Sequence, residues 1–313
     1  MRVVFMGTPE FAVPSLEHLL LNGYQVVAVN TRPDRAAGRG RSLVNSPIKK
    51  AALEWGLTVV QPPNFKNEET VAQLASFKPD VIVVAAFGQI LPQSVLDIPS
   101  QKCINIHPSL LPSYRGASPV AAAIRAGDKF TGVSIMLMEA GMDTGPVLVQ
   151  GQVPVSGYDT TGSLTAKLSL VAAQLLLETL PRWIRGEVTP RPQNEAEASY
   201  TSLLSKQEGE IDWSLPAVEL WRKVRAFQPW PGCYTVLQGK QLKIIEAVPL
   251  SGGKDLKIGQ VLAINGEGVA FGVGTGKGAF GILKVQLEGK KVMPAADFLR
   301  GQKQLIGAFL PSI

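Results

Sequence analysis

The chain of 313 residues has few of the side chains that mark the commonest catalytic and metal sites. Its two cysteines, Cys103 and Cys233, lie far apart in sequence, so neither a disulfide framework nor a zinc site is predicted. Only two histidines are present: His18 lies in a Leu-rich helical pattern, and His107 ends an apolar, strand-like run. If an imidazole carries out chemistry near neutral pH, His107 is the candidate.

Long apolar segments are also missing. No run approaches the ~18 consecutive apolar residues of a membrane span, and residues 1–7 are typical of a first strand rather than of a secretory signal. We therefore expect a cytoplasmic protein with no membrane partner. Hydrophobic residues make up 45% of the chain and charged residues 18%, as in globular proteins with one large domain or two ordinary ones.

Three common catalytic and nucleotide-binding motifs are absent. The first strand is followed by a single glycine, Gly7, where a dinucleotide fingerprint needs three. The glycine-rich segment 272–278 lacks a phosphate loop's spacing, because Phe271 and Gly278 occupy its required glycine and Ser/Thr positions. No G-x-S-x-G nucleophile motif occurs. These absences disfavour an NAD-dependent oxidoreductase, which stays a distant alternative, and a covalent serine mechanism.

The chain is basic, with a net charge of +6 and a pI near 9.3. From residue 207 to the end there are 13 lysines and arginines against 9 acidic residues. This excess is compatible with a polyanionic partner, but a solvated, lysine-rich surface explains it equally well.

The first half alternates apolar runs with helical patterns, which predicts parallel βα units. Helices are expected over 12–22, from the Ser46-Pro47 start to Gly56, and over 160–185, the last N-capped by Asp159 or Thr160. Strands are expected at 2–6, 25–30, 81–86, 103–107 and 133–139.

The pattern changes after residue 185. Residues 186–200, rich in Pro, Glu and Ala, are typical of a linker, and a helix is expected over 216–227. Short strands separated by glycine turns then predict a small barrel, at 234–237, 242–248, 259–264, 269–273 and 283–287. We predict a catalytic domain at 1–189, a linker at 190–206 and a second domain at 207–313.

An amide, an imidazole and a carboxylate follow strand-like runs in the first half. Asn105 and His107, two residues apart on one strand, point to the same side. Asp143 lies in a glycine-containing loop after the next predicted strand. Ligands bind such sheets at the carboxyl ends of the strands, where we expect all three side chains. A purely structural role for His107 is the alternative.

An imidazole oriented by a carboxylate can transfer protons, and a neighbouring amide can stabilise an oxyanion. Without a nucleophile motif, this set suits direct acyl transfer to an amine. No metal is needed, because a neutral amine is already a nucleophile.

A second candidate region is the glycine-containing loop 33–41, with Arg35, Arg39 and Arg41. Guanidinium groups suit phosphate recognition, and the loop follows a strand's carboxyl end. A disordered surface loop is the alternative interpretation.

Segments 105–112 (Asn-Ile-His-Pro-Ser-Leu-Leu-Pro) and 141–145 (Gly-Met-Asp-Thr-Gly) resemble the folate-dependent formyltransferases. The resemblance implies transfer of a formyl group from 10-formyltetrahydrofolate to an amine. It implies that Asn105, His107 and Asp143 are the catalytic residues. It also implies that Ser109, Leu110, Leu111 and Pro112 contact the folate.

Four further segments, 7–11, 33–40, 211–213 and 225–232, are similar to the family members that act on methionyl initiator tRNA. This likeness covers essentially the whole chain. It implies a Rossmann-like α/β domain with a mostly parallel sheet, followed by a small OB-like β-barrel that binds tRNA electrostatically. It also implies that the loop with Arg35, Arg39 and Arg41 contacts the tRNA.

The expected reaction is therefore formylation of methionyl initiator tRNA for translation initiation, with no obligate protein partner. Formylation of a small amine, such as an amino sugar nucleotide, is the nearest alternative, and a tRNA-binding module without catalysis is a more distant one. Either His107 or a water bound to Asp143 serves as the immediate base; the sequence leaves both open.

Overall fold

The computed structural model describes residues 1–37, 42–250, 257–266 and 269–312, and it divides into two compact units. Unit 1 comprises residues 1–119, 130–154 and 164–201. Unit 2 comprises 120–129, 155–163 and the chain from 202 onward. Both units therefore take up segments from within the first 189 residues, and the domain limits drawn from the sequence stay a prediction.

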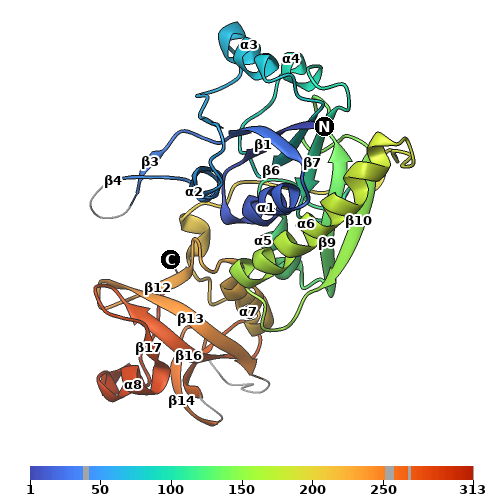
Figure 1. Ribbon diagram of the computed structural model, residues 1–313. Helices are drawn as coiled ribbons and strands as arrows, with labels where there is room; N and C mark the ends of the chain where they lie inside the picture. Colours follow the sequence, from blue (N-terminus) through green and yellow to red (C-terminus); the bar gives the residue numbers. More distant parts are fainter. Residues whose placement is uncertain (38–41, 251–256, 267–268, 313) are drawn as a thin grey trace. The chain divides into compact units, whose positions relative to one another are not determined.

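A seven-stranded sheet forms the centre of unit 1, in the order β10-β9-β7-β6-β1-β2-β5 (Figure 1). Strands β1, β2, β5, β6 and β7 pair in parallel, whereas β9 pairs antiparallel with both β7 and β10. The bounds are β1 (Arg2–Gly7), β2 (Gln25–Asn30), β5 (Val59–Val60), β6 (Val81–Ala85), β7 (Cys103–His107), β9 (Phe130–Leu137) and β10 (Val147–Pro154).

Both faces of the central strands are covered. Every residue of β6 is buried, as expected of a parallel strand between two layers. The first five helices lie between strands in sequence and the sixth follows β10; Ser46 caps α2 by accepting a hydrogen bond from the Lys49 N–H at 3.1 Å. The helix bounds are α1 (Val13–Leu21), α2 (Pro47–Glu54), α3 (Glu68–Ser76), α4 (Gln93–Leu96), α5 (Pro119–Ala126) and α6 (Thr161–Ile184).

Helix α6 is long and apolar enough to cross a membrane, judged by length and composition alone. Of its most apolar stretch, 44% is buried inside the protein, including Leu164, Leu168 and Leu176. Core helices of water-soluble proteins have the same properties, so α6 by itself is weak evidence for a membrane span. Of the two predicted caps, Asp159 and Thr160, it is Thr160 whose Oγ1 accepts from the Ser163 N–H, at 3.2 Å.

The antiparallel direction of β9 corrects one prediction. Leu137, the last residue of β9, pairs with Ile104, and Ser134 pairs with His107. The loop that follows β9 therefore starts beside the amino end of β7, whereas His107 lies at the carboxyl end of β7. The expectation that the Asp143 loop follows a parallel strand is therefore wrong, although the Asp143 side chain does lie beside His107 at the carboxyl end of β7. Its loop must fold back along the sheet to reach His107.

Unit 2 contains an antiparallel sheet in the order β12-β13-β16-β15-β14, with β17 pairing to β16. The predicted class, a mostly parallel α/β sheet followed by a β domain, is confirmed. The bounds are β12 (Cys233–Leu237), β13 (Lys240–Leu250), β14 (Val261–Gly266), β15 (Val269–Gly274), β16 (Ala279–Leu287) and β17 (Met293–Pro294). The expected helix is α7 (Ala217–Ala226), while α8 (Ala295–Arg300) was not predicted.

The C-terminal segment connects the two edges of this sheet. On the β14 side, the Leu310 N–H donates to the Gly259 carbonyl at 2.9 Å, and the Val261 N–H donates to Ala308 at 2.8 Å. On the β12 side, the Thr235 hydroxyl donates to the Pro311 carbonyl at 2.9 Å. A segment that binds both edges gives the sheet a closed, barrel-like character.

Candidate active site

The structure brings Asn105, His107 and Asp143 together. Asn105 Nδ2 donates to Asp143 Oδ1 at 3.3 Å, and His107 Nδ1 lies 3.6 Å from Asp143 Oδ2. Asn105 and His107 share one face of β7, as the alternation of a strand requires. Asp143, 38 residues beyond Asn105, therefore stands between the other two side chains.

His107 has a defined tautomer. Its Nε2 lies 2.9 Å from the carbonyl oxygen of Tyr114, and a carbonyl can only accept, so Nε2 carries a hydrogen. The remaining nitrogen, Nδ1, faces Asp143. The His107 side chain is 5% exposed and presents little surface to a substrate, whereas the Asp143 side chain is 18% exposed.

The Asp143 carboxylate is fixed from several sides. Its Oδ2 accepts the backbone N–H of Gly116 at 2.8 Å. Its φ of +54° is in the left-handed region, which Asp and Asn tolerate better than most residues. Gln193 Nε2 donates to the carbonyls of Asp143 at 2.7 Å and Gly145 at 2.8 Å, which holds the returning loop.

Arg115 binds the side chains that support this loop. The residue is completely buried, and its guanidinium donates to Gln193 at 3.0 Å and to both oxygens of Glu195 at 2.6 and 2.8 Å. It also donates to the Tyr200 hydroxyl at 2.9 Å. Hydrogen bonding to Glu195 raises the pKa of Arg115, and the same bonds lower the pKa of Glu195.

These partners lie in the segment that the sequence predicts to be a linker. Strand β11 (Tyr200–Thr201) pairs with β8 (Arg115–Gly116), and the 3-10 turn Glu195–Glu197 lies just before it. Gly116 has a φ of +103°, and a Cβ there would stand 2.3 Å from the Thr201 carbonyl oxygen. Residues 193–201 thus belong to the site, and no periodicity in the sequence marks them.

The predicted folate segment lies beside β9 and β10. Ser109 is fully buried, and its hydroxyl donates to the Ser113 carbonyl at 2.6 Å. The Ser134 hydroxyl accepts from the Leu111 N–H at 3.0 Å and donates to the Ser109 carbonyl at 2.7 Å. Leu111 is buried, whereas Leu110 and Pro112 are half-buried. The Ser109 and Leu111 side chains therefore shape the segment rather than face solvent.

Two short antiparallel strands flank the arginine loop. Strand β3 (Arg35–Ala37) pairs with β4 (Ser42–Val44), so Arg35 lies on a strand. Arg39 and Arg41 fall outside the described residues. Below the hairpin, Lys49 pairs with Asp34 and donates to Gln61 at 2.7 Å, and this pairing lowers the pKa of Asp34.

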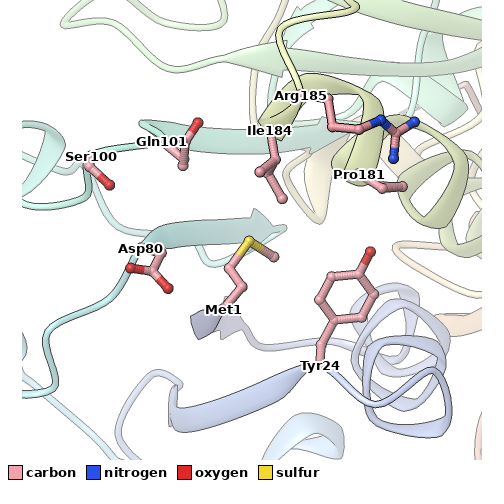
Figure 2. A pocket seen from close by; sticks show the side chains of 8 residues that line it. All are labelled: Met1, Tyr24, Asp80, Ser100, Gln101, Pro181, Ile184 and Arg185. Atoms are coloured by element: carbon pink, nitrogen blue, oxygen red, sulfur yellow. The ribbon is translucent and has the colours of Figure 1, made fainter.

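A cavity of about 420 Å³ in unit 1 lies away from these residues. It is lined by Met1, Asp80 and Gln101, which precede or closely precede β1, β6 and β7, and therefore lies at the amino ends of those strands. Figure 2 shows Met1 and Tyr24 pointing toward Pro181 and Ile184 at the end of α6. His107 lies at the carboxyl end of β7, so this cavity is separate from the predicted site.

The chain matches known protein families and known proteins over most of its length. Residues 1–180 match the model of the formyl transferase family, and residues 203–303 match that of the formyl transferase C-terminal domain. The methionyl-tRNA formyltransferase of Dehalococcoides mccartyi strain 195 is 50% identical over 310 residues, which cover 99% of this chain and 98% of the relative.

Two solved structures share the fold at lower identity. HypX from Aquifex aeolicus, in complex with tetrahydrofolic acid, matches 96% of this chain with a TM-score of 0.64 and 22% identity. This chain spans about half of HypX, 47% of its length. The N-formyltransferase from Helicobacter canadensis, in complex with folinic acid and dTDP-3-aminofucose, matches 90% of this chain and 97% of its own, with a TM-score of 0.66 and 21% identity.

The two domain models cover most of the chain, and the relative at 50% identity covers nearly all of it. The chain therefore belongs to the formyltransferase family, in its methionyl-tRNA formyltransferase branch.

Proposed function

We propose that this chain transfers the formyl group of 10-formyltetrahydrofolate to the α-amino group of methionyl initiator tRNA, in the cytoplasm. The contact of Asp143 with both Asn105 and His107 carries the proposal. The high identity to a methionyl-tRNA formyltransferase supports the choice of acceptor. The products are formylmethionyl-tRNA and tetrahydrofolate.

The roles of the three residues follow from their exposure and bonding. The neutral amine attacks the formyl carbon, and Asn105, which has a second amide N–H beyond its bond to Asp143, donates to the oxyanion that forms. Asp143 is the most accessible acceptor of the amine proton, directly or through one water. His107 is too buried to contact the amine, so it supports Asp143 through Nδ1.

Collapse of the tetrahedral intermediate completes the transfer. The C–N10 bond breaks, the carbonyl re-forms, and N10 takes up a proton from the Asp143–His107 pair. This assignment favours a base centred on Asp143 over direct proton abstraction by His107. The reason is geometric, because both imidazole nitrogens already face protein atoms.

We propose that the segment of Ser109, Leu110, Leu111 and Pro112 binds the folate through its backbone and through the half-buried Leu110 and Pro112. Burial of the Ser109 and Leu111 side chains supports this division. Gln150 stabilises the segment by donating to the Leu111 carbonyl at 2.8 Å.

Arg35, Arg39 and Arg41 are proposed to bind the acceptor end of the tRNA. The pairing of β3 with β4 supports this proposal, because the contacts among Asp34, Lys49 and Gln61 fix the chain just before Arg35. Replacing Arg39 by alanine is expected to lower kcat/KM for charged tRNA about tenfold, with steady-state kinetics at several salt concentrations as the measurement. An unchanged kcat/KM would contradict tRNA binding by Arg39 and favour the alternative of a surface loop without a function in binding.

A formyl-transfer assay tests the function as a whole. Methionyl initiator tRNA and methionyl elongator tRNA are each incubated with 10-formyltetrahydrofolate and the enzyme. We expect formylation of the initiator alone. Folate binding without formylation of either tRNA would overturn the proposed acceptor and direct the search to small amines.

A further inference from the structure

A second cavity, of about 270 Å³, lies in unit 2 where the C-terminal segment passes the end of β12. One wall consists of Val236, Leu237 and Gln238, which lead into the β12–β13 turn. The other wall comes from residues 302–311, the segment that connects both edges of the sheet. The cavity therefore lies at the seam of the barrel-like domain.

Glutamine amides supply the polar groups of this cavity. Gln304 Nε2 donates to Gln302 Oε1 at 2.8 Å. Within the described part of the chain, this bond leaves the Gln302 NH₂ and the Gln304 carbonyl without a protein partner. Gln238, at a φ of +51°, adds a third amide from the opposite wall. Paired donors and acceptors of this kind match the hydrogen-bonding edges of nucleobases.

The remaining lining is apolar and uncharged. Phe309 is 56% exposed, while Leu305 is buried below it in the same segment. The nine described residues that line the cavity include no ionised side chain. The volume lies below the roughly 300–1,000 Å³ of sites for drug-sized ligands, so one flat ring fits better than a complete folate.

We propose that this cavity binds one unpaired nucleobase of the tRNA, stacked on Phe309 and hydrogen-bonded by the amides of Gln302 and Gln304. The proposal rests on tRNA being the substrate. Stacking on an exposed aromatic ring is a general mode of binding single-stranded bases. The phosphates stay outside, where the exposed Lys240 follows the same turn as Gln238. The C-terminal domain would then hold tRNA by a base as well as by charge.

The test is the affinity of the full-length enzyme for methionyl initiator tRNA, measured at several salt concentrations. We expect Phe309→Ala to raise Kd about tenfold, within the range for loss of one base–aromatic stack. The salt dependence of binding should not change, because Phe309 carries no charge. Phe309→Trp keeps an aromatic ring and should bind within about twofold of the parent.

Ile306→Ala is the matched control, because Ile306 is 40% exposed on the same segment but does not line the cavity. Equal affinity of Phe309→Ala and the parent, or equal losses in both alanine variants, would overturn the proposal. Gln304→Ala removes an exposed amide without disturbing packing, so it tests the site even if Phe309→Ala fails to fold; we expect about a threefold higher Kd.

The kinetics separate this inference from the proposed function. At saturating tRNA, Phe309→Ala should keep the parent kcat and show only a higher KM. If the parent formylates tRNA while Phe309→Ala retains its affinity, the nucleobase site alone is wrong. If the parent neither binds nor formylates tRNA, the proposed function fails, and the nucleobase site fails with it.

Discussion

The Nε2 of His107 donates to the carbonyl oxygen of Tyr114 at 2.9 Å, so Nδ1 is left to face Asp143 at 3.6 Å. That separation is longer than a direct hydrogen bond, and it leaves room for adjustment when substrate arrives. The Tyr114 backbone thus fixes which nitrogen of the histidine faces Asp143. Changes at His107 and at Asp143 should therefore have different consequences.

Asp143→Asn is expected to lower kcat about 10²- to 10⁴-fold, because the amide cannot accept the amine proton. The fold should persist, since Asn tolerates the positive φ at this position and retains an oxygen for the Gly116 N–H. Single-turnover formyl transfer gives the rate, and thermal unfolding gives the control for folding. A kcat within threefold of the parent would remove Asp143 from the mechanism.

His107→Ala is expected to lower both turnover and stability. Truncation removes the hydrogen bond from Nε2 to the part-buried Tyr114 carbonyl, at a cost of about 0.5–1.5 kcal/mol in the free energy of unfolding. His107→Gln can still donate to that carbonyl, so it should recover stability without turnover. Denaturant unfolding and kcat are measured for both variants. Full activity in His107→Gln would show that Nδ1 has no part in the reaction.

Gly116→Ala should destabilise the protein by roughly 3 kcal/mol or more, because the new Cβ meets the Thr201 carbonyl and the φ is positive. Activity should fall as well, since the Gly116 N–H holds Asp143. Gly23→Ala is the matched control: its φ is +75°, but its Cβ would meet no atom within 4 Å. The free energy of unfolding of that variant, measured by chemical denaturation, should fall by only about 1 kcal/mol. Equal losses in the two variants would show that the contact with the Thr201 carbonyl has no effect.

Glu195→Gln should be less stable than the parent at neutral pH, and the difference should shrink in acid. Arg115 lowers the pKa of Glu195 in the folded protein. This stabilisation is present above the unfolded value of 4.5 and is lost as pH falls through the lowered folded pKa. Tm measured at pH 7, 5 and 3 tests this. A pH-independent difference for Glu195→Gln would contradict the ion pair.

Local patterns predicted part of the fold, whereas helices α3, α4 and α5 and strands β5 and β10 were not predicted. Continuous apolar runs gave β2 and β7 with their observed bounds, and Ser46 marked the start of α2. These features depend on residues a few positions apart, so sequence alone reveals them. Helix α8 was not predicted, because six residues after a proline carry too short a pattern.

Local patterns also predicted one part of the candidate site and not another. Asn105 and His107 could be paired from sequence because alternate residues of a strand share a face. The position of Asp143 beside His107 could not be derived from the predicted parallel pattern, since β9 runs antiparallel to β7 and the loop after β9 folds back. Gln193, Glu195 and Tyr200 were taken for part of a linker, because side-chain bonds from an irregular segment leave no periodic signal.

The sequence by itself determined the elements that strong local patterns mark, the two kinds of sheet and the chemical nature of the catalytic candidates, because these follow from residue type and local spacing. Only the tertiary structure decided which nitrogen of His107 faces Asp143, and which distant segment supports Asp143. The reason is that hydrogen bonds between residues 7 to 50 positions apart depend on how the chain packs.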